Sequence, residues 1–262
     1  MSNNIFHAVL GSGSCGNSYV LYDGASSIIV DQGFSFVKFK KKFLALGIPI
    51  ESIKAIFLTH FHPDHSNGIR VSSNKLNVPI YISKEAIEKE PVVFKRLNLP
   101  LDRLNEFEIG SCIKIHDFKI NSFKSLHDSG GSVGYYIENK EDKITLISDT
   151  GETTKEMEDY AKKSNILFLE SNYDENMLLN GPYPYKLKKR VSGKWGHLSN
   201  KQALSFLNDS SFCGDYLYLI HLSDKNNDVE LVKKLHTNNK NISNIITCPR
   251  GSFINILGEG EA

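Results

Sequence analysis

A short histidine-rich stretch constrains this 262-residue chain more than any other feature. It follows an apolar run at residues 55–58, which predicts a β-strand, and reads Thr59-His60-Phe61-His62-Pro63-Asp64-His65. Just beyond a strand end, His60 and His62 are two residues apart, so both imidazoles point to the same side. Pro63 then turns the chain and brings Asp64 and His65 back to the same point. These imidazoles and this carboxylate predict a site for zinc, manganese or iron.

Three further donors follow apolar runs downstream. His127, Asp149 and His221 come directly after runs that end at residues 126, 148 and 220. Each therefore lies where a strand gives way to a polar loop, the place from which a rigid sheet presents side chains to a site. Because the donors of the first stretch are too few for two metal ions, we expect these three to complete the ligand set.

The rest of the pattern predicts a mixed α/β protein. Short β-like runs recur, and several are followed by amphipathic stretches, so we expect two packed β-sheets with helices outside them. The expected strands are residues 6–10, 18–22, 27–30, 55–58, 78–82, 113–118, 119–124, 134–138, 144–148, 166–169, 216–220 and 242–247. The expected helices are residues 36–46, 84–97 with an interruption at Pro91, 154–164, 199–207 and 228–236. No linker or repeat divides the chain, so we expect one domain over residues 1–262.

Composition limits the class of protein. The hydrophobic fraction of 40% is typical of a globular protein, and the net charge of +1 excludes a globally basic nucleic-acid binder. No apolar stretch approaches the roughly 18 residues of a membrane helix, and no signal peptide is expected. The four cysteines form no CxxC pair, so we expect reduced thiols in a cytoplasmic protein. We expect structural roles for His7 and His116 on strands, and for His236 as a cation at a helix end.

The motif His60-Phe-His62-Pro-Asp64-His65 resembles the HxHxDH signature of the metallo-β-lactamase fold superfamily, and the likeness extends over nearly the whole chain. The resemblance implies a four-layer αββα sandwich that holds two divalent metal ions. One ion would be held by His60, His62 and His127, and the other by Asp64, His65 and His221, with Asp149 bridging them. Asp31, in Val-Asp-Gln-Gly, looks like the family's first motif, a carboxylate that braces the histidine-rich stretch together with Thr59.

Two ions about 3.5 to 4 Å apart can share a hydroxide nucleophile at neutral pH and neutralise charge on the attacked group. This chemistry suits lactams, thioesters, lactones and phosphodiesters alike, so other residues must decide between them. The segment 183–197 contains five cations and no acid, which favours a polyanion, and Trp195 among them can stack on an unpaired base. The cations are Lys186, Lys188, Lys189, Arg190 and Lys194. A solvated basic loop is the commoner meaning of such a run, and the sequence leaves both open.

Shorter motifs narrow the resemblance. Glu170 and His197 are spaced as in the branch that processes tRNA 3′ ends, where a glutamate orients a histidine that protonates the leaving oxygen. The Gly/Ser-rich loop at residues 11–18, with Ser14 and Asn17 as candidate phosphate contacts, is most similar to the YycJ/WalJ group. That likeness implies a 5′ to 3′ DNA exonuclease and favours DNA over RNA. The expected catalytic residues are Asp64 and, from the likeness to the tRNA-processing branch, Glu170 and His197, although Leu169 stands where that branch has a histidine. Hydrolysis of a small thioester or lactone, or endonucleolytic RNA processing, is the alternative.

Overall fold

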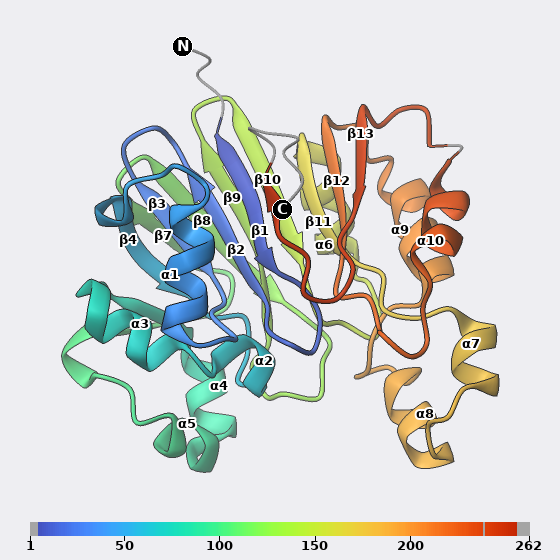
Figure 1. Cartoon of the computed structure of the whole chain (residues 1–262), viewed down its shortest axis with the longest axis horizontal. Coiled ribbons are helices and arrows are strands. Elements are labelled where there is room, and N and C mark those ends of the chain that lie inside the picture. Colours follow the sequence, from blue (N-terminus) through green and yellow to red (C-terminus); the bar gives the residue numbers. More distant parts are fainter. Residues whose placement is uncertain (1–4, 238, 256–262) are drawn as a thin grey trace.

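Two β-sheets form the centre of the molecule, which the computed structural model describes for residues 5–237 and 239–255 (Figure 1). The described strands of the first sheet lie in the order β14 (Ile254–Asn255), β1 (Phe6–Gly11), β2 (Ser18–Tyr22), β3 (Ser27–Val30), β4 (Ile53–Phe57), β5 (Ile80–Ser83) and β6 (Leu104–Phe107). Those of the second sheet lie in the order β13 (Asn244–Thr247), β12 (Tyr216–Ile220), β11 (Ile166–Glu170), β10 (Asp142–Ile147), β9 (Val133–Asn139), β8 (Phe118–Lys124) and β7 (Cys112–Ile115).

Successive residues of the central strands face opposite sides of each sheet. In β3, Ile28 and Val30 pack between the two sheets, whereas Ile29 packs on the outer face of the first sheet. In β11, Phe168 packs between the sheets and Leu169 on the outer face of the second sheet. Because side chains alternate along a strand, an uninterrupted apolar run needs apolar cover on both faces. These runs therefore require helices outside both sheets.

Helices cover both outer faces and complete the expected αββα arrangement (Figure 1). Those that pack on the first sheet are α1 (Phe36–Leu44), α3 (Ile69–Leu76), α4 (Lys84–Lys89) and α5 (Pro91–Leu97). Those that pack on the second sheet are α6 (Lys155–Lys163), α9 (Asn200–Ser210) and α10 (Val229–His236). The remaining described helices are α2 (Pro63–Ser66), α7 (Glu175–Asn180), α8 (Tyr185–Val191) and the 3₁₀ turns Ile50–Ser52 and Leu101–Arg103. None of the described helices is long and apolar enough to cross a membrane.

Strand direction brings several strand ends to one edge of the sandwich. β3 runs parallel to β4, and β10, β11 and β12 run parallel to one another. The carboxyl ends of parallel strands meet at the same edge of a sheet, which is where α/β proteins bind ligands. The residues that follow these strands therefore gather at the lower edge in Figure 1, where α2 and α8 also lie.

Three expectations about local structure were wrong. Residues 113–118 are not one strand, because the chain turns between β7 and β8 at His116, whose φ is 51°. The segment 183–197 is not wholly a loop, since α8 begins after Pro184. His236 is not a cation at the end of α10, because burial lowers its pKa to about 4 and outweighs the helix dipole. The short strands β6 and β14 and the helices α2, α3 and α7 were not expected either.

Candidate metal centre

The histidine-rich stretch leaves β4 and is clamped by the loop after β1. The backbone N–H of Asn17 donates to the Asp64 carbonyl oxygen at 2.7 Å. Gly33 passes so close that a Cβ there would lie 1.7 Å from the same oxygen, so only glycine fits. Pro63 is the first residue of α2, where its fixed φ suits the helix start and turns Asp64 and His65 back toward the strand end.

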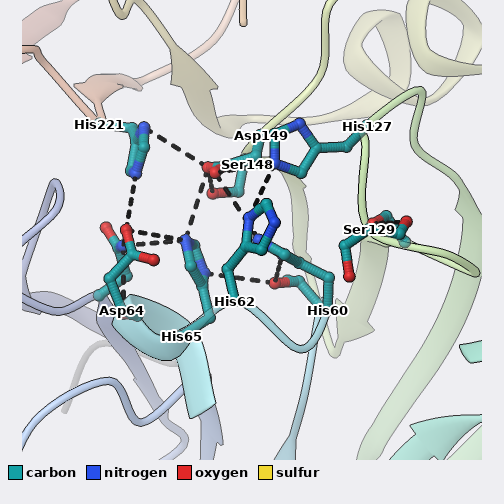
Figure 2. A network of polar contacts seen from close by, with 12 residues as sticks. His60, His62, Asp64, His65, His127, Ser129, Ser148, Asp149 and His221 are labelled. Carbon is teal, nitrogen blue, oxygen red and sulfur yellow. Dashed lines mark hydrogen bonds and ion pairs between the residues drawn. The ribbon is translucent and has the colours of Figure 1, made fainter. Parts of the chain in front are cut away.

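The seven expected ligands lie together at this edge (Figure 2). Their donor atoms form groups within 4.8 Å of one another, each of a kind that can hold a metal ion. One group is His60, His62, His127 and Asp149, and another is Asp64, His65 and His221. A third group, which the sequence did not predict, joins Asp149 and His221 to Glu170 and His197.

Asp149 lies between the first two groups and presents one carboxylate oxygen to each. Its Oδ2 is 3.7 Å from His60 Nε2 and 3.5 Å from His127 Nε2. Its Oδ1 is 3.6 Å from His65 Nε2 and 3.5 Å from His221 Nδ1. Two ligands that are each about 2.1 Å from one ion at a tetrahedral angle lie about 3.4 Å apart. The separations therefore suit a carboxylate that bridges two divalent ions.

The ring nitrogens that face away from Asp149 make hydrogen-bond contacts with residues around the ligand groups. His65 Nδ1 lies 2.7 Å from Asp31 Oδ2, His60 Nδ1 lies 3.0 Å from Thr59 Oγ1, and His127 Nδ1 lies 2.8 Å from a backbone carbonyl. Such contacts orient an imidazole and leave its other nitrogen as a ligand. The buried His60 Nε2 has no hydrogen-bond partner among the described residues, an uncommon state for a buried polar atom. A metal ion there would satisfy it, so these residues fit divalent cations.

Asp31 and His221 hold strained backbone conformations at the centre. Their φ angles are 60° and 59°, in the left-handed region that non-glycine residues rarely adopt. The Asp31 N–H donates to the Phe57 carbonyl oxygen at 2.8 Å, and the His221 N–H donates to Ser12 Oγ at 2.7 Å. The Asp31 carboxylate in turn accepts bonds from the Thr59 N–H and hydroxyl, both at 2.8 Å. The surrounding hydrogen bonds thus fix both side chains at the cost of local strain.

Electrostatics divide the histidines into two kinds. Burial lowers the pKa of His60 and lowers that of His127 to about 4, so both are neutral imidazoles, the form that binds a metal. Although burial opposes it, the Asp149 and Asp31 carboxylates raise the pKa of His65 to about 10. Asp149 likewise raises the pKa of His221 well above its usual value, again against the effect of burial. His65 and His221 therefore lie in a negative potential that favours a cation.

A carboxylate–imidazole pair adjoins the ligands. His197 Nδ1 lies 2.7 Å from Oε1 of Glu170, whose Oε2 accepts bonds from the Thr150 and Leu198 N–H groups at 2.9 and 3.2 Å. Glu170 is fully buried, and although burial opposes it, this carboxylate raises the pKa of His197. The pair therefore favours the protonated form of the imidazole beside the ligands.

A cavity of about 410 Å³ opens over the ligands, and its walls include His197, α8 and the loop after β12. Of the expected substrate contacts, only Ser14 and Arg190 line it. Asn17 is buried instead, with its side-chain amide 2.9 Å from His65 Nε2. The expected contacts that lie outside the lining are Lys186, Lys188, Lys189, Lys194 and Trp195.

Two polar residues at the centre were not expected from the sequence. Asp128 accepts two hydrogen bonds from Arg190, and its Oδ1 lies 3.4 Å from His62 Nε2. Asn172 places its side-chain amide 3.0 Å from His221 Nδ1. Asp128 directly follows an expected ligand in the chain, which was an available signal, whereas Asn172 meets His221 only through the fold.

Comparisons with known proteins bear on the family of this chain. The family model described as a beta-lactamase superfamily domain matches residues 26–222. The exodeoxyribonuclease YycJ of Bacillus anthracis is 32% identical over 229 residues, which cover 86% of this chain and 85% of YycJ. The exodeoxyribonuclease WalJ of Streptococcus pneumoniae serotype 2 is 29% identical over 229 residues, which cover 86% of this chain and 84% of WalJ.

A solved structure shares the fold. The crystal structure of the metallo-beta-lactamase fold protein YhfI from Bacillus subtilis matches with a TM-score of 0.72 at 18% identity. The match covers 95% of this chain and 98% of YhfI. The two-sheet architecture is thus shared with YhfI over nearly the whole of both chains.

Proposed function

The chain belongs to the metallo-β-lactamase superfamily of hydrolases, and on that basis we propose that it is a metal-dependent DNA exonuclease that digests from the 5′ end. The observation that carries the proposal is the placement of Asp149, which has one oxygen toward each ligand group, beside the His197–Glu170 pair. The two relatives named above are both exodeoxyribonucleases and match over most of their length, which supports the choice of DNA. We propose zinc or manganese as the native ion, with iron as the alternative.

These groups would hold two divalent cations, which when bound would supply a nucleophile at neutral pH and neutralise charge on a phosphodiester. The chain's own residues supply orientation and a proton. Glu170 holds His197 through Nδ1, so Nε2 is the atom that carries a proton toward the substrate. As water adds to phosphorus it gives up a proton to the ionised Asp64 carboxylate, the bond to the 3′ oxygen breaks, and the proton of His197 passes to the departing oxygen. The remaining strand then begins with a 5′ phosphate.

Asp64 complements this acid. The hydrogen bond from His221 and the nearby His65, acting against burial, lower its pKa to about 2, so it is an ionised carboxylate. Its Oδ2 lies 3.4 Å from His221 Nε2, at the wall of the cavity. An acid and a base with opposed protonation states in one site are what proton transfer at constant pH requires.

Incubation of the purified protein with Mn²⁺ or Zn²⁺ and end-labelled DNA tests this function. We expect metal-dependent release of the 5′ label as mononucleotide, and little action on RNA of the same sequence. His62→Ala should abolish the activity because it removes a metal ligand, and since His62 is only half-buried the variant should still fold. His116→Ala, in the exposed β7–β8 turn, should leave the activity unchanged.

Parallel assays with a thioester and a lactone cover the alternative. If the wild-type protein hydrolyses these substrates and leaves DNA intact, the proposal is wrong and a small carbonyl compound is the substrate. If RNA is cut internally and DNA is not, RNA processing is correct. The four cysteines are free, two of them exposed, which supports our further proposal of a reducing, cytoplasmic compartment.

A further inference from the structure

A second groove adjoins the metal centre on the side away from α8. This cavity of about 450 Å³ lies between the α2–α3 segment and α5. It shares His62 and Pro63 with the cavity over the metal ligands, so the two cavities adjoin at this pair of residues. In Figure 1, α3 and α5 lie on one side of the lower edge and α7 and α8 on the other. A strand that crosses the ligands can therefore continue into the second groove.

Two arginines set this groove apart from the rest of the surface. The chain has five arginines, and Arg103, Arg190 and Arg250 each pair with an aspartate. Arg70 and Arg96 make no ion pair or hydrogen bond with any residue that the structure describes, and both are exposed and line the groove. The remaining arginines of the described chain are thus satisfied internally, whereas these two present free guanidinium groups to one cavity.

The rest of the lining suits unpaired nucleotides. Val93 and Leu97 are half-buried and Val71 is left 46% exposed beside them, so together they give the groove an apolar surface. The lining contains one acid, Glu90, and its Oε1 already accepts bonds from the Ser129 hydroxyl and the Gly130 N–H. A cationic groove that follows the backbone phosphates is common to single-strand binding sites, and the apolar surface beside it is aliphatic in this groove.

We propose that this groove binds the single DNA strand on the 3′ side of the scissile phosphate, with Arg70 and Arg96 on its backbone phosphates. The inference rests on the proposed function and adds the path of the substrate. His197, which protonates the departing 3′ oxygen, lies in the first cavity, so the nucleotide that is released belongs there. That cavity, about 410 Å³, is near the small end of the roughly 300–1,000 Å³ range of small-molecule sites and suits one nucleotide. The remaining strand extends from the scissile phosphate in the other direction, over His62 and Pro63, into the second groove.

The test compares 5′-labelled single strands of two and eight nucleotides in wild type and in the double variant Arg70→Gln/Arg96→Gln. We expect the ratio of kcat/KM for the octanucleotide to that for the dinucleotide to fall about tenfold, because only the longer strand reaches both arginines. The salt dependence of octanucleotide binding, followed by fluorescence anisotropy, should lose about 1.4 in log–log slope, or about 0.7 per phosphate contact.

Lys75→Gln/Lys95→Gln is the matched control, since it removes the same charge from α3 and α5 at positions outside the groove lining. If this control lowers the kcat/KM ratio as much as the arginine variant does, the loss comes from the overall positive charge of this surface, and the groove is not a binding site. Equal losses on both oligonucleotides overturn the inference as well. If wild type cuts no DNA, the proposed function is wrong, but the anisotropy measurement still tests whether the groove binds DNA. Equal octanucleotide affinity in wild type and the arginine variant would contradict binding in the groove.

Discussion

The two ends of the sandwich contain cavities of similar size with similar residue types, yet among the described residues only one end gathers donor atoms that could hold metal ions. The cavity at the far end, about 430 Å³ among the described residues, contains His7 with Asp23, Asp142 and Asp215, against about 410 Å³ at the metal centre. At the far end, Asn165 donates to Asp142 at 2.7 Å, and His7 Nδ1 lies 2.7 Å from the Tyr218 hydroxyl. These carboxylates and this imidazole are satisfied by neutral donors and do not converge.

At the metal centre the relation is reversed. The carboxylate oxygens of Asp149 face imidazole nitrogens at 3.5 to 3.7 Å, and His60 Nε2 has no hydrogen-bond partner among the described residues. The outer sides of the same rings are held firmly. Volume and residue type therefore do not identify such a site; convergence of unsatisfied donor atoms does.

The largest expected effect separates the two ends directly. Asp149→Asn removes the negative charge between the two ligand groups and should lower kcat at least about 10³-fold, since even one preorganised electrostatic contact is worth about 10²–10³-fold. Metal analysis of the purified variant should also find less than half the wild-type content. Asp142→Asn makes the same change at the far end and should cost stability but leave metal content unchanged. Equal metal loss in both variants would contradict the claim that the metal ions bind at the Asp149 end and not at the Asp142 end.

A second effect sharpens the comparison within the metal centre, because His197 and Glu170 belong to a third possible ligand group. If His197 is a proton donor, His197→Asn should lower kcat on DNA about 10²–10³-fold and leave the metal content unchanged. The loss should be much smaller with a 4-nitrophenyl phosphodiester, whose leaving group needs no proton. Loss of metal from this variant would instead identify His197 as a ligand.

The sequence was sufficient where local pattern and topology agree. His127, Asp149 and His221 each follow an apolar run, and the structure brings them together because their strands end at one edge. The uninterrupted apolar runs of β3 and β11 likewise predicted strands that are buried on both faces, and their side chains do pack alternately between the sheets and under the outer helices.

Tertiary contacts decided the rest. Asn17 looked like part of an exposed phosphate loop, but the packing of that loop on Asp64 buries it. The helix α8 was missed because it buries only Val191 and so lacks the apolar stripe by which helices are recognised. The fold determines which arginines form ion pairs with aspartates. The sequence therefore could not show that Arg70 and Arg96 at the second groove are left unpaired among the described residues.

The smallest effect concerns the far end, where His7 should influence stability and not catalysis. Burial lowers the pKa of His7 to about 4, partly opposed by Asp215, and the rings of Tyr216 and Tyr218 pack against it. The unfolded chain binds this proton near pH 6.5, so the contribution of His7 is fully present above that pH and is lost as the pH falls toward 4. By pH 5 the loss is about 2 kcal/mol.

Urea unfolding of wild type and His7→Gln at pH 7.5 and pH 5 measures this loss. The difference in unfolding free energy between the two proteins should shrink by about 2 kcal/mol at the lower pH, because the histidines of the metal centre and His236 are common to both and cancel. A constant difference for His7→Gln would mean that the far-end cavity admits water and that His7 is not desolvated. The contrast between the two ends would then rest on ligand geometry alone.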